Sequence, residues 1–233
     1  EVESGQANYG VVPVENSTEG MVNHTLDSFA SSSLYIAGEV KLRIHHHLLS
    51  NESVKIGEIK RVYSHQQSLA QCRKWLDANC PQVERVAVSS NAEAALLASK
   101  ESGAVAIAGD MAAEQYSLIR LAENIEDQPD NTTRFLIIGT SIVPASGQDK
   151  TSILVSAKDK PGTLYHVLEP FHRNGISLTR LETRPSNSGT WAYVFFIDFE
   201  GHFDDQEVQA IIDQVSPDVV DIKHLGSYPV GVL

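Results

Sequence analysis

Hydroxyl and amide side chains that could hydrogen-bond a substrate stand directly beside apolar, strand-like runs of the sequence. The run at residues 130–139, DNTTRFLIIG, begins with two threonines and an arginine, and ENST at residues 15–18 follows the apolar run ANYGVVPV. SHQQS at residues 64–68 begins at the last residue of the run IKRVYS. These segments offer no nucleophile with an adjacent base, no paired carboxylates and no phosphate-binding loop. They suit a pocket of neutral donors and one cation, which could bind an anion or assist a leaving group.

Each of these patterns also has a purely structural explanation. Threonine favours strands, and an exposed arginine at a strand edge is common. Ser17 or Thr18 could cap a helix, as could Ser64 or Ser68. The segment at residues 15–18 would nevertheless lie at the C-terminal end of a strand, where α/β sheets gather ligands, and before a helix N-terminus, which attracts anions. The pattern alone leaves both interpretations open.

Strand alternation separates the two adjacent threonines. Neighbouring side chains of a strand point to opposite faces, so one face carries Thr133, Phe135 and Ile137, and the other carries Thr132, Arg134 and Leu136. Because Phe135 and Ile137 are apolar, we expect their face to turn toward the core. Thr133 would then point toward an interior or a cleft, and Thr132 would not.

The three consecutive histidines, His45 to His47, are a further candidate site. In an extended strand His45 and His47 would share a face, and histidines at this spacing can bind a metal. The sequence offers no third ligand at a useful spacing. We therefore expect a structural strand here and no metal site.

The composition is that of an ordinary globular protein, with 42% hydrophobic and 21% charged residues in a chain of 233. The formal net charge of -12 argues against a nucleic acid or an anionic membrane as the main partner. No apolar run approaches the roughly 18–20 residues that span a bilayer. Cys72 and Cys80 lack CxxC spacing, so we expect free thiols in a reducing compartment, the cytoplasm.

The order of elements predicts two domains, at residues 1–140 and 150–233. Strands alternate with helices in the first, which favours an α/β architecture with largely parallel pairing, and residues 140–150 are typical of a linker. The second reads strand, helix, strand, strand, helix, strand, with a turn at residues 186–189 between the middle strands. This βαββαβ order is typical of a ferredoxin-like sandwich.

Several segments together carry a family resemblance. VPVENSTEG, VYSHQQSLAQC, SSNAEAA and NTTRFLIIG, in this order, resemble the catalytic domain of prephenate dehydratases. KPGTLYHVLEPFHRNGISLTRLETRP resembles the phenylalanine-binding ACT domain of the same enzymes, with GTLY in place of Gly-Ala-Leu-Val and ETRP in place of Glu-Ser-Arg-Pro. The likeness covers nearly the whole chain, and it extends to the bifunctional chorismate mutase–prephenate dehydratases of bacteria. It implies a two-lobed, periplasmic-binding-protein-like dehydratase domain followed by an ACT domain.

The resemblance implies decarboxylative dehydration of prephenate to phenylpyruvate in phenylalanine biosynthesis, without a metal or an organic cofactor. Formation of the aromatic ring drives this reaction, so the enzyme need only help hydroxide leave and hold the diacid. The family's catalytic threonine falls on Thr133, in agreement with the strand alternation. The other matching positions are catalytic Asn16, Ser64, Gln71 and Arg134, and substrate-binding Glu15, Ser17, Thr132 and His46.

The resemblance also implies feedback inhibition by L-phenylalanine, bound where ACT domains meet in a homodimer or tetramer. The alternative is that GTLY and ETRP only build the fold, and Thr163 and Tyr165 differ from the family's residues. The positions that match the effector site are Gly162, Thr163, Leu164, Tyr165, Asn174, Ile176, Ser177, Leu178, Glu182, Thr183, Arg184 and Pro185.

One element of the family pattern has no counterpart in this chain. The family's dehydratase domain begins further upstream, with a strand and a Gly-Pro-x-Gly-Thr-Phe-Ser-like loop, whereas this sequence starts at Glu1. We therefore expect an N-terminally incomplete dehydratase domain. The chain is then either a feedback-regulated dehydratase or a catalytically impaired fragment that only binds phenylalanine. The TRF and ENS motifs favour the first interpretation, and the missing loop favours the second.

Overall fold

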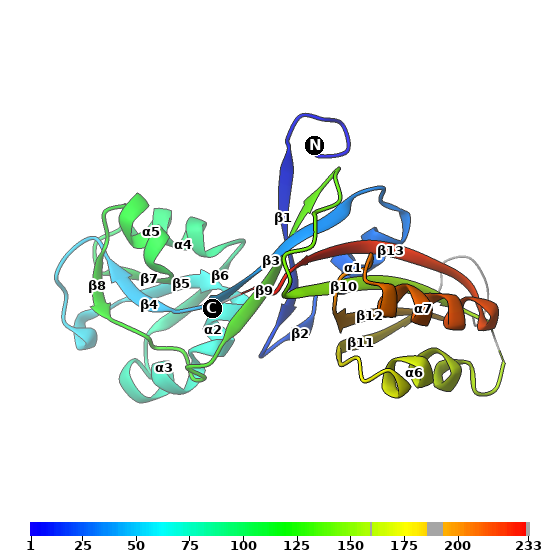
Figure 1. Ribbon diagram of the computed structural model, residues 1–233. Helices are drawn as coiled ribbons and strands as arrows, with labels where there is room; N and C mark the ends of the chain where they lie inside the picture. The colour runs from blue at the N-terminus through cyan, green and yellow to red at the C-terminus, as the bar shows by residue number, and fades with distance from the viewer. Residues whose placement is uncertain (159, 186–192, 232–233) are drawn as a thin grey trace. The chain divides into compact units, whose positions relative to one another are not determined.

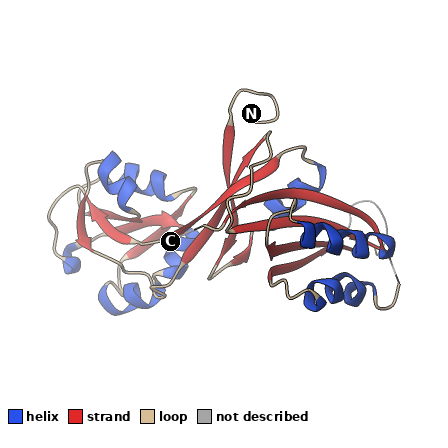
Figure 2. Cartoon of the chain, viewed as in Figure 1, coloured by secondary structure: helices blue, strands red, loops and turns tan. Residues whose placement is uncertain are grey.

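The computed structural model describes residues 1–158, 160–185 and 193–231. The chain forms two compact units, one of Glu1–Leu42 with Thr133–Leu233 and one of Arg43–Thr132. Figures 1 and 2 show the helices and strands of each unit. The first unit therefore combines the strands that carry Asn16 and Thr133 with the C-terminal sheet.

One sheet of the first unit has the strand order β2-β1-β9-β3. Strands β1 and β9 are antiparallel, with Asn16 opposite Thr133 and Glu15 opposite Arg134. This register brings two segments far apart in the sequence side by side. The elements are β1 (Tyr9–Asn16), β2 (Gly20–Met21), α1 (Asn23–Ser31), β3 (Tyr35–Arg43) and β9 (Thr132–Gly139).

The C-terminal sheet has the order β11-β12-β10-β13, and the pairs β10·β12, β10·β13 and β11·β12 are antiparallel. Helices α6 and α7 pack on one face of it (Figure 1). This is the ferredoxin-like βαββαβ arrangement that the sequence predicts. The elements are β10 (Asp149–Ala157), α6 (Thr163–Arg173), β11 (Leu178–Pro185), β12 (Tyr193–Glu200), α7 (Gln206–Val215), η2 (Ser216–Asp218) and β13 (Val219–Pro229).

The central strands β10 and β12 of the C-terminal sheet are buried on both faces. Along β10, Ile153 and Val155 face the helices, whereas Leu154 joins a core with Val14 of β1 and Leu136 of β9. The two chain segments also approach closely: a Cβ atom added at Gly226 of β13 would lie 2.2 Å from the carbonyl oxygen of Ile36 in β3. The C-terminal sheet therefore packs directly against the strands around Asn16 and Thr133.

The second unit is built on a mixed sheet with the order β6-β5-β7-β4-β8. Strand β5 is parallel to β6 and β7, and β4 is antiparallel to β7 and β8. Every residue of β7, AVAIA, is buried, which is typical of a central strand covered on both faces. The elements are β4 (His47–Ser50), η1 (Ile56–Glu58), β5 (Arg61–His65), α2 (Gln66–Gln71), α3 (Arg73–Asn79), β6 (Glu84–Val88), α4 (Asn91–Ala98), β7 (Ala104–Ala108), α5 (Asp110–Gln115) and β8 (Ile119–Ala122).

Several sequence predictions need correction. The expected largely parallel pairing is wrong, because β1 and β4 pair antiparallel with their neighbours. The strand expected through the histidine triplet includes only His47, because β3 ends at Arg43, β4 begins at His47 and residues 44–46 form no strand. Strand β8 was not anticipated, and the predicted turn at residues 186–189 lies outside the described residues. In the part of the chain that the structure describes, no helix is long and apolar enough to cross a membrane.

Candidate functional site

The predicted catalytic threonine is hydrogen-bonded to the predicted catalytic asparagine. Asn16 ends β1, Thr133 lies opposite it in β9, and the Asn16 Nδ2 group donates to Thr133 Oγ1 at 2.8 Å. Both side chains are half-buried. Two residues separated by most of the dehydratase region thus form one contact, which the sequence could suggest only through the family resemblance.

The orientation of the Asn16 amide is fixed by the backbone that follows it. Its Oδ1 atom accepts from the N–H groups of Thr18 at 2.9 Å and Glu19 at 3.0 Å, which is an Asx turn. The Nδ2 group must therefore face Thr133, and Thr133 Oγ1 is the acceptor in that contact. Within the described residues, the Thr133 hydroxyl proton has no acceptor of its own. The pair consequently presents a hydroxyl group that can donate.

Strand β9 alternates as expected, but the apolar core lies on the other side of it. Arg134 and Leu136 are buried, whereas Thr133, Phe135 and Ile137 are half-buried. The expectation that Phe135 and Ile137 mark the core face is therefore wrong. Thr133 points away from the core that β9 shares with the C-terminal sheet.

Arg134 is held by acidic residues of the protein itself. Its side chain is 9% exposed and pairs with Glu39 at 2.6 Å and Asp198 at 2.9 Å. As neighbours in a strand, Arg134 and Thr133 point to opposite faces. Glu15, paired with Arg134 in the register, shares the Arg134 face. The structure therefore separates Arg134 and Glu15 from the Asn16–Thr133 contact.

The remaining predicted substrate contacts of this region lie in turns and at a strand start. Ser17 is exposed in the turn between β1 and β2. Thr132 is the first residue of β9, and its hydroxyl donates to the Asp130 carbonyl at 3.2 Å. These contacts describe a local turn, and they do not by themselves indicate a substrate.

His46 and Gln71 meet in the second unit. The Gln71 Oε1 atom lies 2.9 Å from His46 Nε2 and accepts from Asn131 Nδ2 at 3.3 Å. Burial lowers the pKa of His46, so its ring is neutral at pH 7 with the proton on Nε2. Glu126 fixes the backbone of His46, because its Oε2 accepts the His46 N–H at 2.9 Å. The two donors to Gln71 Oε1, from His46 and Asn131, thus set the orientation of the Gln71 amide.

Glu126 and Asn131 received no role from the sequence. Burial raises the pKa of Glu126, but hydrogen bonds from the His46 backbone and from His45 outweigh it and lower that pKa overall. Glu126 is therefore an ionised anchor for the histidine segment. Asn131 lies within the DNTTRF segment itself, and its position beside the threonines was the available signal.

Ser64 is completely buried at the end of β5. Its Oγ lies 2.8 Å from the Ile107 carbonyl oxygen and 3.0 Å from Asn91 Oδ1. Asn91 also accepts the His65 N–H at 3.1 Å and donates to Ser68 Oγ at 2.9 Å. In this conformation Ser64 joins the strand end to β7 and α4, and its hydroxyl does not reach solvent.

The outer histidines of the triplet contact carboxylates. His45 Nδ1 lies 2.8 Å from Glu126 Oε1, and His47 Nε2 lies 3.2 Å from Asp110 Oδ1. Over the described ranges, no three His, Cys, Asp or Glu side chains are grouped as metal ligands. The shared-face argument for His45 and His47 is wrong, because His45 precedes strand β4.

A cavity of about 240 Å³ lies at the start of α6. It is lined by the predicted effector residues Gly162, Thr163, Leu164 and Tyr165, together with residues that include Phe195 of β12. Gly162 has φ +85°, a conformation that favours glycine. The cavity is smaller than the roughly 300–1,000 Å³ of typical ligand sites.

The other predicted effector residues lie on β11 and in the turn before it. Asn174 ends α6 and donates to the Pro170 carbonyl at 2.7 Å, and Ile176, Ser177 and Leu178 follow. Arg184 is occupied by a bidentate ion pair with Asp27 of α1, at 3.0 and 2.8 Å. Neither the turn residues at 174–178 nor Arg184 lines the cavity at the start of α6. The remaining positions, Glu182, Thr183 and Pro185, belong to β11.

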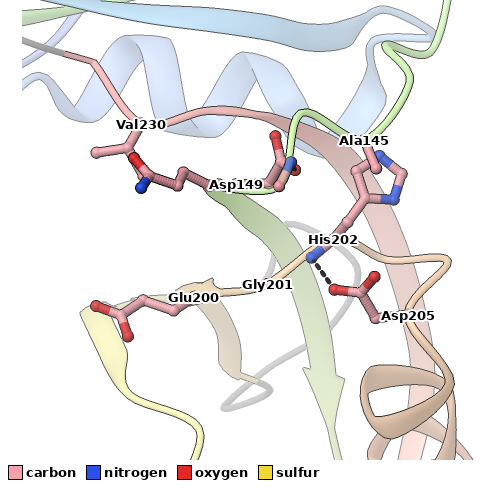
Figure 3. Close-up of a pocket in the computed structure, with 9 residues that line it drawn as sticks. Ala145, Asp149, Glu200, Gly201, His202, Asp205 and Val230 are labelled. Atoms are coloured by element: carbon pink, nitrogen blue, oxygen red, sulfur yellow. Dashed lines mark hydrogen bonds between the residues drawn. The ribbon is translucent and has the colours of Figure 1, made fainter.

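A larger cavity, of about 520 Å³, lies beside the segment that precedes β10 (Figure 3). It is bordered by acidic side chains, among them Asp149, Glu200 and Asp205. Asp149 already accepts from Ser146 and Gly147, and Asp205 accepts the His202 N–H at 2.8 Å. Asp149 and Asp205 therefore hold the surrounding loops, and no predicted site residue lines this cavity.

The family models and the similar sequences agree with one another. The family described as prephenate dehydratase matches residues 1–142, and the ACT domain matches residues 151–216. A bifunctional chorismate mutase/prephenate dehydratase of Pseudomonas aeruginosa is 61% identical over 233 residues, 100% of this chain. The chain spans only 64% of that relative's length.

Solved structures show the same architecture. The prephenate dehydratase of Arthrobacter aurescens in complex with L-Phe aligns with a TM-score of 0.88 at 35% identity, covering 98% of this chain and 77% of that one. A protein described as GqqA, a novel type of quorum quenching acylase, aligns with a TM-score of 0.86 at 30% identity, covering 98% and 84%. The first of these likenesses confirms the predicted fold class, a two-lobed α/β dehydratase region of the periplasmic-binding-protein kind with a ferredoxin-like ACT domain.

Proposed function

Because the chain belongs to the prephenate dehydratase family, we propose that it serves the decarboxylative dehydration of prephenate to phenylpyruvate in phenylalanine biosynthesis. One observation supports this most strongly: Asn16 donates to Thr133 Oγ1, so the threonine hydroxyl keeps its own proton for another acceptor. The leaving hydroxyl of prephenate is such an acceptor. The cytoplasm fits the two free, buried thiols of Cys72 and Cys80.

The proposed reaction needs one assisted departure. The ring C–O bond breaks, the bond to the ring carboxylate breaks, and the electron pair of that second bond completes the aromatic ring as carbon dioxide leaves. Thr133 hydrogen-bonds the departing oxygen and passes it a proton, which Thr133 regains from solvent, so that the oxygen leaves as water. Asn16 stabilises negative charge that develops on Thr133 Oγ1. A free threonine hydroxyl is a weak acid, so Thr133 acts as a donor or within a relay.

Gln71 is the proposed orienting group of the second unit. Its oxygen is taken by His46 and Asn131, which turns the amide NH₂ the other way. An NH₂ group held in a fixed direction can orient a substrate carboxylate. Ser64, Ser17 and Thr132 stay proposals of the family resemblance, with Ser64 the weakest because its hydroxyl is buried.

We further propose that L-phenylalanine binds at the α6 cavity and lowers dehydratase activity. The small volume of the cavity suits half of a site that a second copy of the chain completes, as in a homodimer or tetramer. By linkage, prephenate would weaken phenylalanine binding by the same factor. Calorimetry on the wild-type chain tests this directly, and a folded dimer that releases no binding heat with phenylalanine contradicts it.

The competing interpretation is a phenylalanine-binding module without catalysis. Prephenate is incubated with this chain and with a version extended upstream, and the absorbance of phenylpyruvate is followed. Turnover by both supports the enzyme. Turnover by the extended version alone shows that upstream residues complete the site, and turnover by neither, with phenylalanine still bound, supports the binding module.

A further inference from the structure

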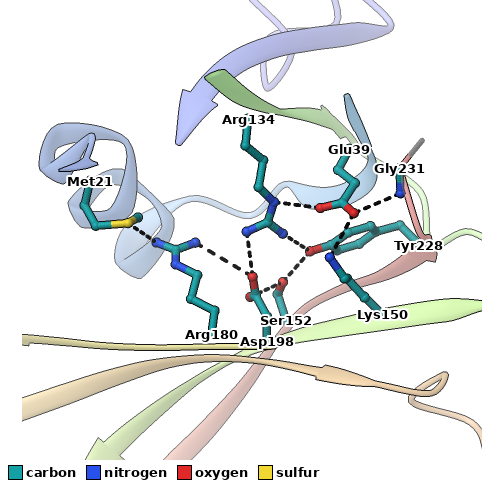
Figure 4. Close-up of polar contacts among 9 residues, drawn as sticks. All are labelled: Met21, Glu39, Arg134, Lys150, Ser152, Arg180, Asp198, Tyr228 and Gly231. Atoms are coloured by element: carbon teal, nitrogen blue, oxygen red, sulfur yellow. Dashed lines mark hydrogen bonds and ion pairs between the residues drawn. The ribbon is translucent and has the colours of Figure 1, made fainter. Parts of the chain in front are cut away.

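Asp198 lies between two buried arginines at the face of the C-terminal sheet that meets the other sheet of its unit (Figure 4). Its Oδ2 atom is 2.9 Å from Arg134 Nη1 and 3.8 Å from Arg180 Nη1. Its Oδ1 accepts the Ser152 hydroxyl at 2.6 Å. Asp198 is 4% exposed, so this carboxylate interacts with protein groups rather than with solvent.

Arg134 uses each part of its guanidinium. Nε donates to Glu39 at 2.6 Å, Nη1 to Asp198 at 2.9 Å and Nη2 to the Tyr228 hydroxyl at 3.0 Å. Because Ser152 donates to Asp198, Tyr228 must be the donor in its 2.8 Å contact with Ser152. The hydrogen bonds therefore run in one direction from Arg134 through Tyr228 and Ser152 to Asp198, and the position of each group depends on the others.

Arg180 connects the same carboxylate to the β1–β2 hairpin. Its Nη2 contacts the sulfur of Met21 at 3.6 Å, and Met21 pairs with Glu15, the residue before Asn16. The Nε atom of Arg180 is buried and has no hydrogen-bond partner among the described residues. Arg180 belongs to β11, the strand that also carries the predicted effector residue Glu182.

Both strands that carry the Asn16–Thr133 contact, β1 and β9, are thus connected to Asp198 through an arginine. Arg134 adjoins Thr133 in β9, and Arg180 reaches the strand paired with the end of β1. Among the described residues, the cations Arg134, Arg180 and Lys150 form ion pairs with the carboxylates Glu39 and Asp198, and Glu15 lies on the same face as Arg134. Loss of the Asp198 charge would remove the ion-pair partner of Arg180 and one of the two partners of Arg134, so both side chains would have to adjust.

We propose that Asp198 is a positioning residue that couples the ACT sheet to the Asn16–Thr133 pair. The Asp198 carboxylate fixes Arg134 and Arg180, and these two arginines fix the ends of β9 and β1. A shift of β11 would therefore be transmitted through Asp198 to the Asn16–Thr133 pair. The inference rests on the proposed function where turnover is measured. Backbone amide exchange requires no turnover, so it tests the coupling even if prephenate is not the substrate.

The test compares Asp198→Asn with wild type in the full chain. We expect kcat for prephenate to fall about 10–100-fold with little change in KM, because the donor is displaced while the remaining substrate contacts persist. Amide exchange at residues 15–16 and 133–134 should become about tenfold faster, while exchange in β5 and β7 stays as in wild type. The midpoint of phenylalanine inhibition should shift by about threefold or more.

A second substitution that restores the charge balance should partly rescue the Asp198→Asn variant. Arg180→Met combined with Asp198→Asn removes one cation together with one carboxylate, so slow exchange at residues 133–134 should partly return. Asp77→Asn is the matched control, because Asp77 is an exposed residue of α3 that pairs with Arg85 and Arg73, so its loss should leave kcat, exchange and inhibition unchanged. A folded Asp198→Asn protein with wild-type exchange at residues 15–16 and 133–134 overturns the proposal, whatever its activity.

A second variant decides the matter if Asp198→Asn does not fold. Arg180→Met keeps the Asp198–Arg134 pair and removes the long 3.8 Å pair to Asp198 together with a buried Nε that has no partner among the described residues, so its melting temperature should not fall. Exchange at residues 15–16 should still accelerate, and phenylalanine should inhibit less steeply. Wild-type exchange there, together with an unchanged phenylalanine response, refutes the coupling.

Discussion

Asn16→Asp reverses the direction of the hydrogen bond at the proposed catalytic threonine. The new carboxylate can still accept the N–H groups of Thr18 and Glu19, so the turn after β1 is preserved. It cannot donate to Thr133 Oγ1, and it would instead accept the threonine proton at the present contact distance of 2.8 Å. Thr133 would then be engaged with the protein and unable to assist the leaving oxygen.

The expected loss follows from the role of that donor. Removing one preorganised donor at developing charge lowers kcat by about 10²–10³, or roughly 2.7–4 kcal/mol. Stability should change little, because the two turn hydrogen bonds become charge-assisted and one hydrogen bond to Thr133 is retained. For a chain of this length a change of about 1 kcal/mol moves Tm by roughly 2–4 °C.

The assay measures phenylpyruvate formation across prephenate concentrations, beside the melting temperature of each protein. Asn79→Asp is the matched control, since Asn79 is an exposed residue at the end of α3 whose amide donates to the Trp75 carbonyl of the same helix. Its kcat should equal that of wild type. An Asn16→Asp protein with wild-type kcat and Tm refutes the argument that the Asn16 donor leaves the Thr133 proton available.

Gly226→Ala should lower the free energy of unfolding, measured by urea titration, by about 3 kcal/mol or more, because its Cβ would lie 2.2 Å from the Ile36 carbonyl oxygen. The control is Gly57→Ala, whose Cβ would meet no atom within 4 Å, and it should change that free energy by less than about 0.5 kcal/mol. Burial lowers the pKa of His224 to about 4, so the unfolded chain binds more protons and stability should fall as pH drops from about 6.5 toward 4, by at most about 3 kcal/mol. In His224→Gln that part of the loss should vanish, and an unchanged pH dependence would contradict the assignment. The Cys72 thiol is buried, and burial raises its pKa, so it should react with an aromatic disulfide reagent only when the protein unfolds. Rapid labelling of Cys72 in the native protein would contradict its burial.

Local patterns in the sequence were enough for the ACT fold and for the separation of Thr133 from Thr132. The periodicities of strand and helix follow from short segments, and the alternation along β9 is a property of any strand. Whether two strands pair parallel or antiparallel could not be predicted from such local patterns. Strand β1 pairs with β9 across a long stretch of chain, and the apolar residues of both strands fit parallel or antiparallel neighbours equally well.

The role of Arg134 shows why the site could be predicted only in part. Its neighbour Thr133 made a catalytic arginine plausible, but its partners Glu39 and Asp198 come from β3 and β12, far away in the sequence. The available signal was an aspartate within the apolar strand VFFIDFE, since a charge inside such a run is normally paired. Ser64 gave no comparable signal, because a serine at a strand end caps, packs or binds with the same sequence pattern.

Turnover of prephenate by wild type and by Thr133→Val tests the central claim most directly. Valine keeps the shape of threonine and removes the hydroxyl, so Asn16 loses its acceptor while the strand pairing persists. The account predicts phenylpyruvate formation by the active wild-type protein and a kcat at least about 100-fold lower in the folded Thr133→Val protein. A Thr133→Val protein that forms phenylpyruvate at the wild-type rate would contradict it.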